Sequence, residues 1–136
     1  MCDLDLLAVR ENLPQVLQFV DDKLASFDVS KKIITEIDVS VEEIFVNIAS
    51  YAYDPLVGPA TIRTEIKEDP LSVVISFIDG GSPYDPLARP DPNLKMPVKD
   101  RRRGGLGIFM VKKTMDDVAY EYKDGQNILT IKKQLM

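Results

Sequence analysis

Ser30–Ile48, which reads SKKIITEIDVSVEEIFVNI, carries the clearest structural pattern in this chain. Apolar residues recur in it at intervals of three and four, which is the spacing of one face of an α-helix. They are Ile33, Ile34, Ile37, Val41, Ile44, Phe45 and Ile48. Ser30 opens the pattern, and Pro55 with Gly58-Pro59 ends it. We therefore expect a long amphipathic helix.

Helical and strand-like runs surround this helix in a definite order. The other predicted elements are a strand over 4–9, a helix that Asn12 caps and that reaches about Leu24, strands over 60–67 and 71–78, a helix over 105–115, and strands over 117–122 and 127–133. Strands in adjacent hairpins and helices grouped together predict an α+β two-layer sandwich. We expect one mixed, mainly antiparallel sheet with the helices on one face, in a single domain over 1–136.

Composition limits the classes of protein to which the chain can belong. It has 136 residues, 45% hydrophobic and 29% charged, which is ordinary for one soluble globular domain. No apolar run approaches the roughly 20 residues that a membrane span needs. Acids stand near the N-terminus, at Asp3 and Asp5, where a secretory signal carries bases. A cytoplasmic location without membrane association is the expectation.

The absence of histidine excludes several kinds of chemistry. Neither a Ser-His-Asp triad nor an imidazole zinc site is possible on this chain, and the one cysteine, Cys2, cannot form an internal disulfide. The net charge of −5 argues against direct nucleic-acid binding, which normally needs a basic surface.

Glu43 and Asn47 lie four residues apart on the long helix, so their side chains project from one face, about 40° apart. Apolar neighbours place the pair near the edge of the core, where polar groups are costly without partners. A Mg²⁺ ion held by the Asn47 oxygen, with Glu43 orienting or deprotonating a nucleophile, supplies such a partner. Taken alone, the helix favours the simpler interpretation, a solvent-facing Glu-Asn pair.

Asp79-Gly80-Gly81 ends an apolar strand, where packing alone does not call for a carboxylate. Asp79 there can accept a hydrogen bond from the amino group of adenine, and Gly81 lets the backbone turn close beneath the base. An ordinary Asp-Gly turn explains the same residues equally well.

A long proline-rich stretch, about 80–104, precedes the third helix, and a structureless loop of that length is usually functional or disordered. It ends in Arg101-Arg102-Arg103 and the run Gly104-Gly105-Leu106-Gly107. Glycines at a helix start allow close approach, and free N–H groups at the positive helix end attract phosphate oxygens. We expect a long loop followed by a helix start that can bind phosphate, although a Gly-Gly-x-Gly run alone is a weak signal.

Three of these motifs together resemble those of a known superfamily. Glu43-x-x-x-Asn47 resembles the N-box of the GHKL ATPases, Asp79-x-Gly81 their first glycine box, and Gly105-x-Gly107 their second. Gyrase, heat-shock chaperones, histidine kinases and mismatch-repair ATPases belong to this superfamily. The likeness covers nearly the whole chain.

Two further stretches resemble one branch, the anti-sigma-factor serine kinases. The segment after the first glycine box typically reads Pro-Phe-Asp-Pro there, and here it is Pro83-Tyr84-Asp85-Pro86. The block Gly104–Val111, with Met115-Asp116 behind it, is similar as well.

The resemblance implies that Mg-ATP binds between the helices and a lid loop over about 80–104. Asn47 would bind the metal, Asp79 would contact adenine, and Glu43 would act as the catalytic base. The residues it places around the nucleotide are Asn47, Asp79, Gly81, Arg103, Gly104, Gly105, Leu106 and Gly107. It implies transfer of the ATP γ-phosphate to a serine of an anti-anti-sigma (STAS-type) partner. Control of a sigma factor, and hence of transcription, follows from this activity. It also implies a possible homodimer through the sheet, for which the edge over 4–9 is suitable. Which of Arg101, Arg102 and Arg103 contacts phosphate stays open.

The chain departs from the family pattern at two positions. Family kinases often have a histidine four residues after the N-box asparagine, where this chain has Tyr51, and Pro83 replaces the second glycine of the first box. Two alternatives therefore stand beside the kinase. One is an ATP-binding regulatory module, catalytically weak or inactive, that sequesters a partner. The other is a soluble α+β domain without a nucleotide site.

Overall fold

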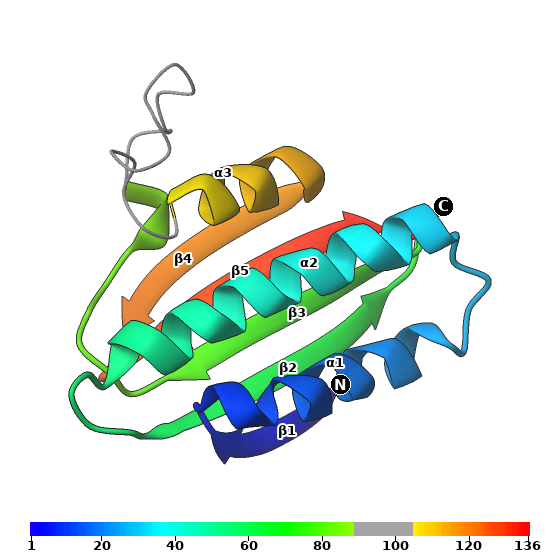
Figure 1. Ribbon diagram of the computed structural model, residues 1–136. Coiled ribbons are helices and arrows are strands. Elements are labelled where there is room, and N and C mark those ends of the chain that lie inside the picture. The colour runs from blue at the N-terminus through cyan, green and yellow to red at the C-terminus, as the bar shows by residue number, and fades with distance from the viewer. Residues whose placement is uncertain (89–104) are drawn as a thin grey trace.

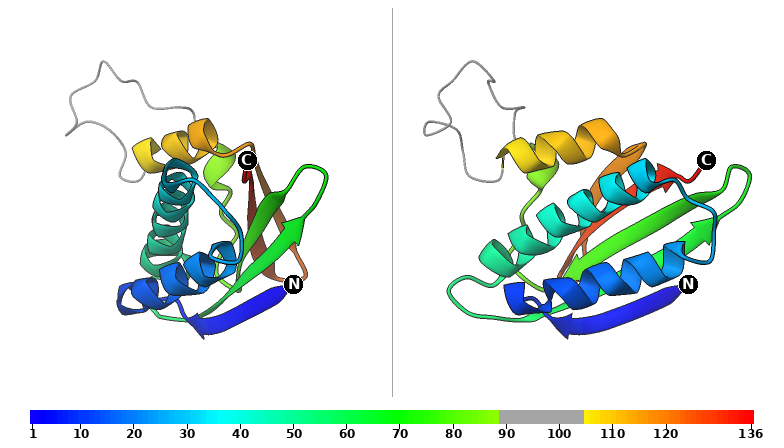
Figure 2. Two further views of the ribbon diagram at one scale, coloured as in Figure 1. Left: turned by 90° about the vertical axis from the view of Figure 1, so that its right-hand side faces the viewer. Right: turned by 45° about the vertical axis from the view of Figure 1, so that its right-hand side comes forward.

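The computed structural model describes residues 1–88 and 105–136, with side chains in the second range from Gly107 onward. One five-stranded sheet has the order β1-β2-β3-β5-β4, and every neighbouring pair is antiparallel. Its strands are β1 (Cys2–Leu7), β2 (Pro59–Lys67), β3 (Ser72–Asp79), β4 (Asp117–Lys123) and β5 (Gln126–Gln134). Three helices, α1 (Leu13–Leu24), α2 (Lys31–Asn47) and α3 (Gly105–Thr114), lie on one face of the sheet (Figures 1 and 2). The predicted α+β sandwich is confirmed.

Helix α2 runs across the middle of the sheet, with α1 and α3 on either side of it (Figure 1). Its start is the one that the sequence indicates, because the Ser30 side chain accepts a hydrogen bond from the Ile33 N–H at 3.3 Å. Its buried residues, which include Ile37, Ile44 and Phe45, are those of the predicted apolar face.

The start of α1 differs from the prediction. A 3₁₀ turn, η1 (Arg10–Asn12), precedes the helix, so Asn12 has helical dihedral angles and its side chain makes no capping hydrogen bond. Its amide instead donates to the Leu7 carbonyl at 2.9 Å. Strand β1 also ends two residues earlier than predicted, because the chain turns there: the Val9 N–H donates to the Leu7 carbonyl at 2.9 Å.

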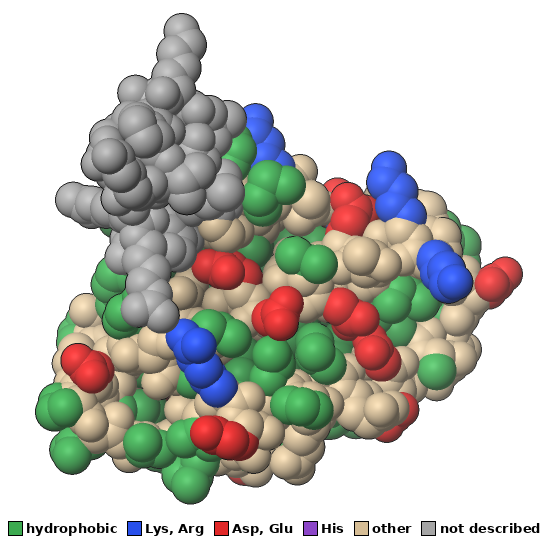
Figure 3. All heavy atoms as spheres, in the orientation of Figure 1, with side chains coloured by type: hydrophobic (Ala, Val, Ile, Leu, Met, Phe, Trp, Pro, Cys, Tyr) green, Lys and Arg blue, Asp and Glu red, His purple; other side chains and the backbone are tan. Residues whose placement is uncertain are grey.

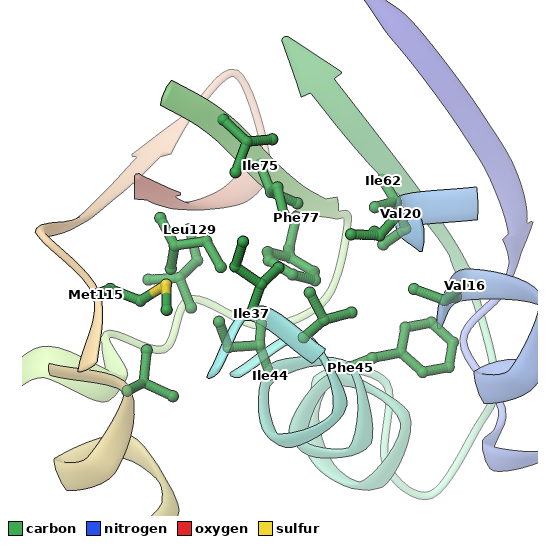
Figure 4. Packing of buried hydrophobic residues seen from close by; sticks show 14 of the residues in the cluster. Val16, Val20, Ile37, Ile44, Phe45, Ile62, Ile75, Phe77, Met115 and Leu129 are labelled. Atoms are coloured by element: carbon green, nitrogen blue, oxygen red, sulfur yellow. The ribbon is translucent and has the colours of Figure 1, made fainter. Parts of the chain in front are cut away.

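The core lies between α2 and the inward face of the sheet. Inward residues alternate along the strands, with Val73, Ile75 and Phe77 on β3 and with Leu129 and Ile131 on β5. Ile37 and Ile44 of α2 point toward them, while Phe45 points toward Val16 of α1, which together with Val20 closes one side (Figure 4). The same inward face continues at the ends of β3 and β5, where Asp79 lies opposite Asn127.

Helix α2 continues into a π-helical turn, η2 (Ile48–Ala52), of a kind that frequently marks functional sites. Tyr53 follows it, and its hydroxyl donates to the Pro59 carbonyl and accepts from the Gly80 N–H at 2.7 Å. These contacts fix the end of α2 beside the end of β3.

The loop predicted over 80–104 is only partly described. Its first residues pack against the domain and include a 3₁₀ turn, η3 (Pro86–Ala88), in which Pro86 is buried. Residues 89–104 lie outside the described residues.

Candidate functional site

A cavity of about 240 Å³ lies at the C-terminal end of α2, between that helix, the end of β3 and the start of β5. Most of its walls are apolar, with a few polar side chains among them, as is usual for small-molecule sites. Its lining residues are Ile44, Asn47, Ile48, Tyr51, Ala52, Phe77, Asp79, Ser82, Pro83, Tyr84, Pro86, Ile108, Tyr120, Asn127 and Leu129. Two predicted site residues, Asn47 and Asp79, therefore face one space.

The first polar wall is formed by α2 and the start of α3. Asn47 Nδ2 donates to Glu43 Oε1 at 3.2 Å, which confirms that the two side chains share a helix face. Gly107 stands directly against this carboxylate: a Cβ atom built there would lie 2.0 Å from the Glu43 carboxyl carbon. Glycine at 107 is thus required by the close approach of α3 to Glu43.

Glu43 is half-buried, and burial is the main reason why its pKa is raised above the ordinary value for glutamate. The hydrogen bond from Asn47 opposes this shift by favouring the carboxylate, and the negative charge of Glu42 adds to it. A raised pKa brings the carboxylate closer to the range in which it can take up a proton during a reaction.

Glu43 and Gly107 also line a second hollow, of about 620 Å³, between α2 and α3 on the outside of the molecule. Acidic side chains gather over α2 on this face, with apolar ones among them (Figure 3). Val39 and Met110 line the hollow and are about half exposed. The Asn47–Glu43 hydrogen bond therefore lies between an inner cavity and an outer groove.

Asp79 forms the second polar wall of the inner cavity and is only 5% exposed. Its Oδ1 accepts from the Gly81 N–H at 2.9 Å and from Asn127 Nδ2 at 3.0 Å. Among the described residues, Oδ2 receives no hydrogen bond. It is left as a charged acceptor for a donor in the cavity.

Gly81 is required by the neighbouring backbone. A Cβ atom built at Gly81 would lie 2.1 Å from the Ala52 carbonyl oxygen, to which the next residue, Ser82, donates through its N–H at 3.0 Å. The close approach thus joins the turn after β3 to η2.

Sequence reasoning missed Asn127 and Tyr120. Asn127 is 7% exposed, and its carboxamide bridges Asp79, the backbone of 81–84 and the Tyr120 hydroxyl. A signal was available: Asn127 is in phase with Leu129 and Ile131 on β5, so it is a polar residue at an inward position. Tyr51, noted in the sequence only as a departure, lines the cavity as well.

The remaining predicted site residues lie at the start of α3 or before it. Arg101, Arg102, Arg103 and Gly104 are outside the described residues, so the structure does not bear on their predicted contact with phosphate. Gly105 begins α3 as predicted, and Leu106 follows it.

The donor atoms fit a magnesium ion that is held mainly by a nucleotide. The Asn47 amide nitrogen donates a hydrogen bond to Glu43, whereas the amide oxygen has no hydrogen bond within the described part of the chain. Among the same residues no cluster of three or more acidic, histidine or cysteine side chains could hold a metal alone. Mg²⁺ usually takes one or two protein oxygens together with phosphates and waters, so one amide oxygen suffices.

Residues 6–133 match the family model of the histidine kinase-like ATPase domain. The chain belongs to this family. Membership implies ATP binding, and the predicted resemblance to the GHKL ATPases is confirmed.

The chain is similar to several named protein kinases. The chain is 31% identical over 90 residues to the serine/threonine-protein kinase BtrW of Bordetella bronchiseptica, covering 66% of this chain and 63% of that one. It is 28% identical over 103 residues to the serine-protein kinase RsbW of Bacillus cereus, and this match covers 73% of this chain and 63% of the relative. The matches thus span just under two thirds of the length of these relatives.

A crystal structure of the RsbU and RsbW domains of a Mycobacterium tuberculosis protein has the same fold. It superimposes with a TM-score of 0.66 at 17% identity, over 99% of this chain and 33% of that one. Within the described residues, the helices are too short or too polar to cross a membrane.

Proposed function

We propose that the chain binds Mg-ATP in the inner cavity and transfers the γ-phosphate to a serine of a protein partner. Asp79 Oδ2 accepts a hydrogen bond from the adenine amino group, while Phe77, Leu129 and Ile108 supply apolar contacts to the base. The carboxylate prefers adenine to guanine because guanine presents a carbonyl oxygen at the same ring position.

The phosphates extend from the base toward Asn47 and Gly107, where the start of α3 supplies N–H groups and the positive end of a helix dipole. Asn47 Oδ1 holds the magnesium ion, which neutralises phosphate charge when bound. Arg103, Gly104, Gly105 and Leu106 complete this wall in the proposal.

The observation that carries the proposal is the junction of Asn47, Glu43 and Gly107. One side of this junction faces the nucleotide cavity, and the other faces the outer groove between α2 and α3. A serine hydroxyl that enters through the groove meets the Glu43 carboxylate beside the phosphate-binding helix start. Glu43 takes the hydroxyl proton as the oxygen attacks the γ-phosphorus, and ADP leaves.

The partner that we propose is a STAS-type anti-anti-sigma protein, and the chain is then an anti-sigma factor. The matches to kinases named RsbW and BtrW and the Pro83-Tyr84-Asp85-Pro86 segment support this assignment. Binding of a sigma factor, a homodimer through the sheet and a cytoplasmic location belong to the same proposal. The sheet edge at β1 is available for a dimer, and light scattering tests it, since a strict monomer at high concentration would contradict it.

The test is phosphate transfer from ATP labelled at the γ-phosphate to the STAS-type proteins of the source organism. Glu43→Gln should lose transfer while its ATP affinity stays within about twofold of wild type, because the base acts on the hydroxyl. Glu121→Gln is the control, since this acid is exposed on β4 and lines neither the inner cavity nor the outer groove. Transfer that survives in Glu43→Gln would overturn the assignment of the base.

Tyr51 supports a second candidate, an ATP-binding regulatory module that sequesters its partner without phosphorylating it. The side chain lines the cavity one turn beyond Asn47, where family kinases often have histidine. If wild type binds ATP and the partner yet transfers no phosphate, and if Tyr51→His restores transfer, this candidate holds.

A further inference from the structure

Asn127 is a buried polar side chain that the proposed chemistry does not use. It occupies the inward position of β5 opposite Asp79, and it is 7% exposed. A carboxamide in such a place is costly unless its polar atoms are paired.

Every polar atom of the Asn127 carboxamide has partners. Nδ2 donates to Asp79 Oδ1 at 3.0 Å and to the Ser82 carbonyl at 2.9 Å, with the Gly81 carbonyl at 3.4 Å. Oδ1 accepts from the Tyr84 N–H at 3.1 Å and from the Tyr120 hydroxyl at 2.5 Å. Both hydrogens and both lone pairs are in use, so no polar atom of Asn127 is left to bind a nucleotide.

These partners also fix which way the amide points. The Tyr84 backbone N–H can only donate, so it requires the amide oxygen at its position. Asp79 and the Ser82 carbonyl can only accept, so they require the nitrogen at theirs. A flipped amide would set oxygen against two acceptors and nitrogen against a donor.

The fixed amide in turn determines which oxygen of Asp79 is available. Oδ1 is held by Asn127 Nδ2 and by the Gly81 N–H, and Asp79 lines the cavity, so Oδ2 is the oxygen left to accept a hydrogen bond there. Without Asn127, the Gly81 N–H alone would hold the carboxylate, which would then rotate more freely.

We infer that Asn127 is a positioning residue for base selection: it holds Asp79 so that one carboxylate oxygen faces the 6-amino group of the purine. The same amide joins Asp79 to the backbone of Ser82 and Tyr84, where the loop over 80–104 begins. The inference rests on the proposed binding of ATP in this cavity, and it assigns to Asn127 an effect through Asp79 without contact to the base.

The test compares two nucleotides that differ only in the group that Asp79 would read. Calorimetry gives the dissociation constants of ATP and of purine riboside triphosphate, which has hydrogen in place of the 6-amino group. We expect wild type to prefer ATP by about tenfold or more, the range of a hydrogen bond to a charged acceptor. In Asn127→Ala and Asn127→Ser this preference should fall close to one.

The ratio of the two dissociation constants separates positioning from general structural damage, which would weaken the binding of both nucleotides alike. Asp79→Asn should give the lowest ratio of all the variants. The donors from Gly81 and Asn127 hold the remaining oxygen, so the new amide nitrogen would face the amino group of ATP, and two donors would then meet. Thr130→Val is the matched control: it removes a 3.2 Å hydrogen bond to Ser76 between the same two strands, on the outer face. It should keep the wild-type ratio.

Thermal unfolding establishes that each variant is folded at the assay temperature. Tyr120→Phe removes only a hydroxyl, which donates to Asn127 Oδ1 and accepts from the Tyr84 N–H at 3.3 Å. It provides a milder test, with a smaller fall in the ratio, if both Asn127 variants unfold. A wild-type ratio in folded Asn127→Ala or Asn127→Ser, together with a reduced ratio in Asp79→Asn, overturns this inference alone. Failure of wild type to bind either nucleotide overturns the proposed function itself.

Discussion

At the scale of single residues, two glycines show why residue type matters at this site. Gly107 is next to Glu43 and Gly81 is next to the Ala52 carbonyl, so neither position has room for a Cβ atom. At Gly80, which directly precedes Gly81, a built Cβ would meet only the Tyr53 hydroxyl among the described residues, at 3.5 Å. The site is therefore sensitive to one extra carbon atom at particular positions.

Gly107→Ala should reduce phosphate transfer by about a hundredfold, because the new methyl group displaces the carboxylate that acts as base. The fold should survive, since alanine favours a helix over glycine by roughly 0.5–1 kcal/mol. Transfer rates and thermal unfolding of the same preparation check both statements. Gly80→Ala, the control, should leave transfer unchanged, and equal rates for the two variants would contradict the account.

The pH profile of transfer should reflect Glu43. A raised pKa means that the carboxyl group keeps its proton to higher pH, and the protonated group cannot act as a base. Transfer should therefore rise as pH increases through a value above that of ordinary glutamate, while ATP affinity changes much less. A profile that is flat from pH 4 to pH 8 would be inconsistent with Glu43 as base.

At the scale of elements, α1 and α2 meet through two acids, Asp21 and Asp38. One oxygen of each carboxyl group is buried without a hydrogen-bond donor within the described residues. Burial, together with the adjoining Asp21, raises the pKa of Asp38 to about 7. A proton on Asp38 supplies the missing donor, so the contact between the helices favours the protonated form.

Asp38→Asn should stabilise the fold at pH 8 by about 1 kcal/mol, a moderate value because water screens partly exposed groups. Wild type binds this proton more tightly when folded, so its stability should decrease as pH rises from about 4 to about 7. The advantage of Asp38→Asn should therefore disappear near pH 4. Urea unfolding of both proteins at pH 4 and at pH 8 checks this, and Asp28→Asn, at an exposed position, is the control. A stability gain of Asp38→Asn that does not depend on pH would contradict the prediction.

Helix α2 offers a matched pair for the core. Ile37 is fully buried under the sheet, whereas Val39, two residues on, is 54% exposed. Ile37→Ala should cost about 2–5 kcal/mol of unfolding free energy and Val39→Ala less than about 0.5 kcal/mol. Similar losses in the two variants would show that α2 is oriented differently.

At the scale of the whole molecule, local patterns were enough to predict the architecture. The three-and-four spacing after Ser30 corresponds to α2, and the strands predicted over 117–122 and 127–133 correspond to the β4–β5 hairpin. Asp79 was identified because it is polar at the end of an apolar strand, whereas the role of Asn47 was implied by the resemblance to the GHKL ATPases. The spacing of Glu43 and Asn47 already placed them together on one helix face.

What the sequence did not reveal depends on contacts between distant segments. The bonds of Asn127 with Asp79 and Tyr84 arise because β5 enters the sheet between β3 and β4, and no local pattern specifies that order. The failed cap at Asn12 has a similar cause, since the turn η1 redirects its side chain to Leu7.

The measurement that tests the central claim most directly is calorimetric titration of the purified chain with ATP and GTP, with and without Mg²⁺. We predict magnesium-dependent binding of ATP that GTP does not match. Asp79→Asn should lose the preference for ATP, and Asn47→Ala should lose the dependence on magnesium. No binding at millimolar nucleotide, or equal affinity of the wild-type chain for ATP and GTP, would contradict the assignment of this cavity to adenine nucleotides.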